Sequence, residues 1–398
     1  MSAERPALEG GTPVHAGAPV PFFRAPLSED DIQAVVDTLR SGWLTLGPRV
    51  GEFETACTAR VGATHGVAVS SCTAGLFLAL RAFGVGPGDE VLVPSLTFAA
   101  SVNTIRHTGA TPVLCDIEME GFGIDPAAAA ALIGPRTRGI VTVDYAGHPS
   151  RLDALGDLCR EHGLFLLDDA AHAFGAALHG KPVGAWADAT AFSFYATKCI
   201  TTGEGGLVTT EDAGLAHQVR LLGYHGMARD AWKRYTDRGT WYYEVELPGY
   251  KCNMTDVQAA LGLSQLRREP ELRASRIAVA DFFQAAFADE PGLLRPSVRP
   301  GAEHAWHLYV VQLQLDRLRT DRETFSHALR EEGVVPSVHF IPYHRHPAGR
   351  GLELRRPLVH TETFADRCLS LPLYPHMPAA EQNAVVDAVR KLLHWYAR

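Results

Sequence analysis

Short apolar, β-rich runs alternate with helical patterns over residues 65–210, and this alternation constrains the fold more than any other feature. We expect strands at residues 65–71, 90–94, 111–117, 139–145, 164–168, 191–194 and 207–210. Between them, apolar residues recur at helical spacing at 73–83, 99–107 and 151–162. Strands that alternate with helices indicate a mostly parallel sheet with helices on both faces. The sequence therefore predicts an α/β fold whose ligands lie at the carboxyl ends of the strands.

Capping patterns place two more helices outside this region. Ser28, with Asp31 three residues later, opens a helix that ends at Gly42. Thr255, with Gln258 three residues later, opens a second helix that extends to about residue 266. A separate, longer helix is expected over residues 271–288, where alanines are frequent.

The C-terminal part repeats the alternation on a smaller scale. It is predicted to contain a strand at 307–315, a helix at 320–332, a strand at 334–340 and a final helix after Pro378. Three prolines at 291, 296 and 300 precede it. We therefore expect an N-terminal tail at 1–27, a large domain at 28–270 and a small α+β domain at 271–398.

Composition narrows the function classes. The 398 residues are 46% hydrophobic and 21% charged, which is typical of a soluble globular enzyme. The formal net charge of −8 argues against nucleic-acid binding, and no apolar stretch approaches the length of a membrane span. Seven cysteines without a CxxC pair, and an N-terminus without the apolar core of a signal peptide, favour a cytoplasmic protein.

A carboxylate and an amine follow two of the predicted strands. Asp168 and Asp169 end one strand, and Lys198 lies just past another. Pyridoxal phosphate (PLP) chemistry needs such a pair, because an amine holds the aldehyde as a Schiff base while a carboxylate keeps the pyridine nitrogen protonated. Neighbouring strand residues point to opposite faces, so only one aspartate can face the cofactor, and we favour Asp169. Taken singly, such an aspartate is more often a helix cap, and such a lysine is more often on the surface.

The amine needs particular properties for this chemistry. Lys198 requires a lowered pKa to act as a nucleophile near neutral pH, and once freed it can transfer a proton between two carbons. His172 is placed to hydrogen-bond the phenolic oxygen of the cofactor, although a buried structural histidine is the alternative. The glycine-rich turn at 201–206 allows the backbone to pass close to the cofactor.

Two further patterns fit a phosphorylated aromatic cofactor. Small and hydroxyl residues join a strand to a helix at Ser70, Ser71, Cys72, Thr73 and Ala74, where free amides and hydroxyls can bind a phosphate. Simple helix capping is the alternative for this segment. Phe98, at a strand end, can stack on the pyridine ring, or it can be a core residue.

Taken together, these motifs resemble the DegT/StrS-type sugar aminotransferases from about residue 20 to the end. The matching segments are SGWLTLGP (41–48), SSCTA (70–74), PSLTF (94–98), DDAAHAFG (168–175), FSFYATK (192–198), TTGEGG (201–206), GYKCNMTD (249–256), HLY (307–309) and LSLPLYP (369–375). The resemblance implies a PLP-dependent transferase of fold type I, like aspartate aminotransferase. Such a fold has a large, mostly parallel, seven-stranded-type sheet domain and a small α+β C-terminal domain.

The resemblance also implies an activity and its residues. It implies a homodimer, with the active site at the subunit interface, that converts a keto group of a nucleotide-linked sugar to an amine with glutamate or glutamine as donor. By motif position, Lys198 resembles the Schiff-base lysine, Asp169 the pyridinium partner and His172 the phenolate neighbour. The remaining implied positions are Phe98 for stacking, Ser71, Cys72, Thr73, Ala74 and Ser193 for the phosphate, Asn253 for the cofactor of the partner subunit, and Trp43, Thr45, Lys251 and His339 for the substrate.

Some departures bear on the substrate. Cys72 replaces a glycine common in the family, and KCN (251–253) is nearer to members that act on 4-keto sugar nucleotides. A keto-cyclitol substrate, a PLP-binding member with a sensor or regulatory role, and a PLP enzyme of another reaction class are the alternatives. His339, His344 and His346 fit no usual zinc spacing, so we predict no metal site.

Overall fold

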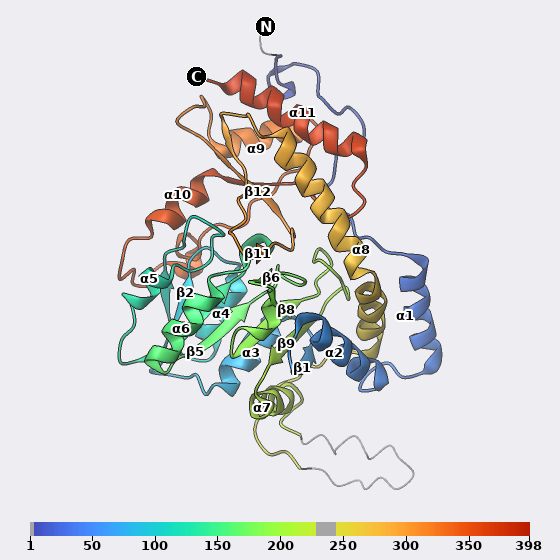
Figure 1. Ribbon diagram of the computed structural model, residues 1–398, viewed down its shortest axis with the longest axis vertical. Coiled ribbons are helices and arrows are strands. Elements are labelled where there is room, and N and C mark those ends of the chain that lie inside the picture. Colours follow the sequence, from blue (N-terminus) through green and yellow to red (C-terminus); the bar gives the residue numbers. More distant parts are fainter. Residues whose placement is uncertain (1–3, 228–243) are drawn as a thin grey trace.

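The computed structural model describes residues 4–227 and 244–398, and a seven-stranded sheet lies at its centre (Figure 1). The strand order is β1-β9-β8-β5-β4-β2-β3. These strands are β1 (His65–Val69), β2 (Glu90–Pro94), β3 (Thr111–Cys115), β4 (Thr137–Val143), β5 (Phe165–Asp169), β8 (Ala189–Ser193) and β9 (Gly206–Thr210). Neighbours from β3 to β8 pair in parallel, and β9 runs antiparallel to β8 and β1. The predicted mostly parallel α/β fold is confirmed.

Helices cover both faces of this sheet (Figure 1). They are α2 (Pro48–Val61), α3 (Cys72–Ala82), α4 (Ala99–His107), α5 (Pro126–Ala130), α6 (Leu152–His162) and α7 (Ala213–Gly223). Helix α1 (Glu29–Ser41) instead packs on α8 (Asp256–Ala286). Alternate strand residues enter two separate cores, since Leu92 and Leu166 belong to one, and Val91 and Leu167 to the other. This alternation is what a sheet covered on both faces requires.

The capping patterns form as the sequence predicts. The Ser28 hydroxyl accepts from the Asp31 amide at 3.3 Å, and the Asp31 carboxylate accepts from the Ser28 amide at 2.9 Å. Gly42 ends α1 in the left-handed region, with φ of 78°. These local contacts fix the start and the end of α1.

One long helix, α8 (Asp256–Ala286), replaces the two helices predicted for this region. It begins at the Thr255 capping box and continues through Pro270. Its first half packs into a core of the large sheet through Ala259 and Leu272, and its end packs into the C-terminal core through Phe283. Pro270 has no N–H to donate, but the helix continues through it because both of its ends are buried. The domain boundary at 270 stays a prediction.

The C-terminal part builds its own sheet from β10 (Leu293–Leu294), β12 (Tyr309–Leu313) and β13 (Cys368–Leu371). Its helices are α9 (Arg322–Glu331), α10 (Val359–Arg367) and α11 (Ala379–Tyr396). The strand predicted at 334–340 is wrong, because only Val334 and Ser337 make isolated bridges, to Val20 and Ser370. Pro336 lies between them and has no N–H to donate to a ladder.

Shorter elements complete the description. A third sheet contains β6 (Ala177–Leu178), β7 (Lys181–Pro182) and β11 (Ala302–Glu303), and the 3₁₀ turns are Ala7–Glu9, Tyr145–Gly147, Val183–Ala185, Tyr343–Arg345 and Pro347–Gly349. Over residues 4–227 and 244–398, none of the helices has both the length and the apolar character needed to cross a bilayer.

The N-terminal segment is docked on the C-terminal part around one buried carboxylate. Glu332 accepts from the amides of Ala7 and Val14, each at 2.8 Å. Lys391 pairs with the same carboxylate at 3.0 Å, and the two side chains are 4% and 0% exposed. Lys391 also donates to the carbonyl of Thr12 at 2.6 Å. The segment predicted as a tail is therefore anchored by charge-assisted hydrogen bonds.

Removing this anchor should destabilise the protein. We expect Glu332→Ala to lower the free energy of unfolding by about 3–5 kcal/mol, because it leaves the Lys391 ammonium buried without a counter-charge. Urea unfolding measures the loss, and limited proteolysis should cut the freed N-terminal segment. Glu331→Ala is the matched control, since that side chain is 52% exposed. Equal losses in the two variants would contradict the anchoring role.

A second ion-pair group joins β2 to the C-terminal part. Glu90 is 3% exposed and accepts from Arg136 Nε at 2.9 Å and from Arg355 Nη1 at 2.9 Å. The hydrogen bond from Arg355, only partly offset by burial, lowers the pKa of Glu90 to about 2. In the folded protein, the two arginines therefore stabilise the charged form of Glu90 more than its protonated form.

This lowered pKa has a defined pH window. The stabilisation is complete above the unfolded value of about 4.5 and is lost as the pH falls towards 2. We expect Glu90→Gln to lower the free energy of unfolding by about 1–3 kcal/mol at pH 6. As the pH falls from 4.5 to 2, the free energy of unfolding of this variant should decrease less than that of the native protein. Urea unfolding at pH 6, 4 and 3 tests this, and parallel pH curves for both proteins would contradict it.

Candidate active site

Asp169 ends β5 as a buried carboxylate with several hydrogen-bond donors. Ser101 Oγ donates to Asp169 Oδ2 at 2.6 Å, and the Ala171 amide donates to Oδ1 at 3.2 Å. Thr97 Oγ1 lies 2.6 Å from Ser101 Oγ, which extends the network. Burial raises the pKa of Asp169, and the Ser101 hydrogen bond opposes that rise. The network holds the carboxyl group in one orientation.

Asp168 has different surroundings. It is 0% exposed, and its carboxyl group lies against that of Asp144 instead of accepting from hydroxyl and amide donors as Asp169 does. Burial, followed by the charge of Asp144, raises its pKa well above the ordinary value. The two adjacent aspartates therefore have separate neighbours, as the alternation of strand side chains predicts.

Lys198 lies just after β8, close enough to Asp169 for their charges to interact. Its amide donates to the Tyr195 carbonyl at 2.9 Å, and its carbonyl accepts from Arg276 Nη2 at 3.4 Å. Burial lowers the pKa of the Lys198 amine, which Cys72 and Asp169 partly offset. A lowered pKa increases the fraction of neutral amine, the form that attacks a carbonyl.

His172 is held as one tautomer. The Ala146 amide donates to His172 Nδ1 at 3.2 Å, so the ring proton lies on Nε2. Burial lowers the pKa of His172 well below 6.5, with Lys198 as the second cause. A neutral imidazole with an Nε2 proton can donate to an oxygen beside Lys198.

The N-terminus of α3 lies beside this group. Ser71 Oγ accepts from the Ala74 amide at 3.1 Å, so this hydroxyl caps α3. Cys72 Sγ lies 3.7 Å from Asp169 Oδ1 and 3.4 Å from the Ala191 carbonyl, and therefore faces the carboxylate. Thr73 is exposed at the same turn. First-turn amides of α3 and the Thr73 hydroxyl are the groups suited to an anion.

The glycine-rich turn approaches α3 closely. A Cβ at Gly206 would lie 2.5 Å from the carbonyl carbon of Ser71 and 2.6 Å from the amide nitrogen of Cys72. Ser193, at the end of β8, accepts from the Tyr195 amide at 3.3 Å.

Phe98 precedes α4 and is 61% exposed, so it is not a core residue. Its ring lies 5.8 Å from that of Phe340.

The residues predicted for the partner subunit and the substrate form a second group at the end of β1. Asn253 bridges to Val69, and its Nδ2 donates to Thr45 Oγ1 at 3.3 Å. Lys251 Nζ donates to Asn253 Oδ1. Trp43 is 52% exposed next to them. Trp43, Thr45 and Lys251 are exposed in the single chain, whereas Asn253 is half-buried.

His339 belongs to the Lys198 group, whereas His344 does not. His339 Nδ1 lies 2.8 Å from Ser370 Oγ, and burial, followed by Lys198, lowers its pKa to about 4. His344 instead contacts Ser95 at 2.7 Å and Glu362 at 2.6 Å. Within the described ranges, no set of three or more His, Cys, Asp or Glu side chains has the arrangement of a metal site.

Sequence reasoning missed three residues of this site. Ser101 is the donor to Asp169, and His307 packs 4.5 Å from the His172 ring. Phe340 lies 5.8 Å from the same ring. Only Ser101 carried a local signal, four residues after Thr97 on the predicted helix. His307 and Phe340 reach the site through the packing of the C-terminal part.

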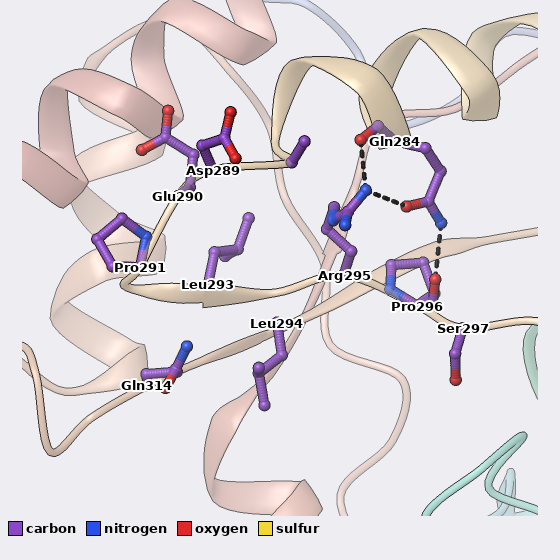
Figure 2. A pocket seen from close by; sticks show the side chains of 11 residues that line it. Gln284, Asp289, Glu290, Pro291, Leu293, Leu294, Arg295, Pro296, Ser297 and Gln314 are labelled. Atoms are coloured by element: carbon purple, nitrogen blue, oxygen red, sulfur yellow. Dashed lines mark hydrogen bonds between the residues drawn. The ribbon is translucent and has the colours of Figure 1, made fainter.

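A surface hollow on the C-terminal part is a weaker candidate (Figure 2). Arg295 Nη1 donates to the Gln284 carbonyl at 2.6 Å, and Gln284 Nε2 donates to the Pro296 carbonyl at 2.6 Å (Figure 2). These hydrogen bonds occupy the Gln284 side chain and one nitrogen of Arg295.

The sequence model of the DegT/DnrJ/EryC1/StrS aminotransferase family matches residues 26–390. The chain belongs to this family. It is 47% identical over 378 residues to the spore coat polysaccharide biosynthesis protein SpsC of Bacillus subtilis (strain 168), covering 94% of this chain and 97% of SpsC. The protein is therefore an aminotransferase, and its relatives are sugar aminotransferases.

Solved structures of family members share the whole fold. The PLP form of the putative sugar aminotransferase Spr1654 from Streptococcus pneumoniae has a TM-score of 0.87 at 31% identity, covering 94% of this chain and 98% of that one. DesI, studied in the presence of its TDP-sugar product, has a TM-score of 0.87 at 32% identity, covering 97% of this chain and 95% of DesI. The fold-type I architecture is confirmed.

The family is PLP-dependent, and the residues around Lys198 fit this cofactor. An amine of lowered pKa and a buried, hydrogen-bonded carboxyl group lie within electrostatic reach of each other. The close contact between Gly206 and the Ser71–Cys72 backbone leaves the N-terminus of α3 free of side chains from β9. A Schiff-base amine, a pyridinium partner and an anion site are the three features that PLP requires.

Proposed function

We propose that the protein transfers an amino group from glutamate or glutamine to the keto carbon of a nucleotide-linked sugar, with a 4-keto sugar as the favoured substrate. Membership of a sugar aminotransferase family supports the reaction. The TDP-sugar product of DesI supports a nucleotide-linked substrate. The KCN segment at 251–253 favours the 4-keto position. The observation that carries the proposal is the convergence of Lys198, Asp169 and His172 at the ends of β5 and β8.

These residues divide the chemistry among them. When bound, PLP supplies an electron sink for the carbon that loses its proton. Lys198 would hold the cofactor covalently, and its freed amine would be the group that moves a proton between the substrate carbon and the cofactor carbon. Asp169 keeps a proton at the pyridine nitrogen, and Ser101 holds its carboxylate in place. His172 would donate a hydrogen bond from Nε2 to the phenolic oxygen.

The remaining residues bind and orient the cofactor. We assign the phosphate to the first turn of α3, through the amides there and the Thr73 hydroxyl, with Ser193 beside it. Phe98 has the exposure that a stacking aromatic residue needs. The side chains of Ser71 and Cys72 act indirectly, the first by capping α3 and the second by packing on Asp169.

We further propose a homodimer with the active site at the subunit interface. Apolar side chains are exposed along α1 and the segment after it, among them Ile32 (50%), Leu39 (53%) and Leu44 (48%). An exposed apolar patch of this kind supports a protein contact. Asn253, which is half-buried, contacts Thr45 next to Leu44, and the exposed Lys251 contacts Asn253, so a second subunit on this patch could reach both.

Product analysis tests the proposed function. Purified protein with PLP and glutamate is incubated with a panel of 3-keto and 4-keto sugar nucleotides and inososes, and amine formation is scored by mass spectrometry. We expect amination of a 4-keto sugar nucleotide. Amination of an inosose and of no sugar nucleotide would show that the substrate is a keto-cyclitol. A protein that aminates none of the panel and never converts PLP to its amine form with any donor would contradict the proposal.

A further inference from the structure

The N-terminal strap, residues 4–24, precedes residue 26, where the match to the sequence model of the family begins. Its backbone is fixed on the C-terminal part beyond the Glu332 anchor. Val20 donates to the Gly333 carbonyl at 2.9 Å and accepts from the Val335 amide at 3.1 Å. Val20 is also 1% exposed within the C-terminal core. The strap therefore follows a defined path up to residue 20.

That path places Phe22 on His339. The two rings are stacked, with centroids 5.4 Å apart and planes 25° apart. The imidazole is held at a second point by Ser370 Oγ, 2.8 Å from Nδ1. In the described part of the chain, the other ring nitrogen, Nε2, has no hydrogen-bond partner. The stack and the hydrogen bond together fix the ring and leave Nε2 available.

His339 connects the strap to the reaction centre. Its ring lies 5.1 Å from that of Phe340, which in turn lies 5.8 Å from His172 and 5.8 Å from Phe98. Lys198 is close enough to contribute to the lowered pKa of His339. A continuous row of rings thus extends from the strap to the residues assigned to the cofactor.

We propose that the N-terminal strap forms part of the substrate-binding wall, with Phe22 as a positioning residue that holds the His339 imidazole for a hydrogen bond to the sugar. This inference rests on the proposed function, because it assigns the sugar to that same site. A sugar hydroxyl can donate or accept, so either tautomer of a neutral imidazole suits it. Phe22 itself has no polar group and acts only through His339.

Three variants separate positioning from simple packing. Phe22→Ala removes the stack, and Phe22→Tyr keeps it. Phe23→Ala is the matched control, because Phe23 packs on the C-terminal core instead of on His339. The first measurement needs no cofactor: diethyl pyrocarbonate modifies accessible histidines in the cofactor-free protein, and peptide mapping gives the rate at His339. The second compares KM for the keto sugar nucleotide with the rate of the half-reaction with glutamate.

We expect Phe22→Ala to speed the modification of His339 several-fold and to raise KM for the keto sugar by roughly three- to tenfold, the range of one aromatic pair. The glutamate half-reaction should stay within about twofold. Phe22→Tyr should keep the modification rate of His339 and the KM for the keto sugar near their native values, and Phe23→Ala should change neither. Unchanged His339 reactivity in Phe22→Ala, or equal effects of Phe22→Ala and Phe23→Ala, would overturn the proposal. If no keto sugar is aminated at all, the proposed function fails, while the reactivity of His339 still tests the contact with Phe22.

Discussion

Lys198→Ala is expected to hold PLP without a covalent bond and to lose about 10³-fold or more in turnover. One amine performs two tasks, covalent attachment and proton transfer, and no other described lysine lies beside Asp169. The structure supports both tasks, since burial lowers the pKa of this amine and Asp169 lies within electrostatic reach of it. Absorbance spectra of the protein mixed with PLP, and single-turnover rates with glutamate, measure the loss.

Lys181→Ala is the control for this experiment. Lys181 lies on the surface, with its Nζ 4.8 Å from the centroid of the Trp186 ring. The control should keep the native spectrum and the native rates. A Lys198 variant that turns over within about tenfold of the native enzyme would show that proton transfer does not depend on this amine.

Asp169→Asn is expected to lower turnover by about 10²-fold or more and to weaken cofactor retention. The amide cannot carry the negative charge that keeps the pyridine nitrogen protonated, although its shape still suits Ser101 and Ala171. Steady-state turnover and the release of PLP during gel filtration measure the two effects. Both effects follow from the loss of one charge, because the substitution changes little else.

The adjacent aspartate gives the sharpest control. Asp168→Asn changes the same functional group one residue away, where the carboxyl group faces Asp144 instead of Ser101. Burial and the charge of Asp144 raise the pKa of Asp168, so its carboxyl group ionises less readily than an ordinary aspartate. We expect turnover within a few-fold of the native value. A large loss in Asp168→Asn with near-normal rates in Asp169→Asn would show that the wrong carboxylate was chosen.

Local patterns in the sequence decide which residues of the candidate site lie together. The ends of parallel strands meet at one edge of a sheet, so Asp169 and Lys198 could be paired from the positions of β5 and β8 alone. The alternation of side chains along β5 separated Asp168 from Asp169. The capping motifs at Ser28 and Thr255 rest on contacts across three residues, and both form.

Features that depend on distant packing were not predictable in this way. The sequence pattern predicted one helix to about residue 266 and a separate one from 271, but burial at both ends keeps α8 continuous through Pro270. The run at 334–340 has the composition of a strand, yet Pro336 prevents a ladder there. His307, Phe340 and Phe22 reach the Lys198 group only because the C-terminal part and the N-terminal strap fold against the sheet. Nothing in their local sequence indicates this contact.

The most direct test of the account is to reduce the PLP-loaded protein with borohydride and to map the labelled peptide. We predict a single label, on Lys198. Lys251 is the informative alternative, because burial also lowers its pKa and it lies in a segment assigned to the site. Label on Lys251, on another lysine or on none would contradict the assignment of Lys198.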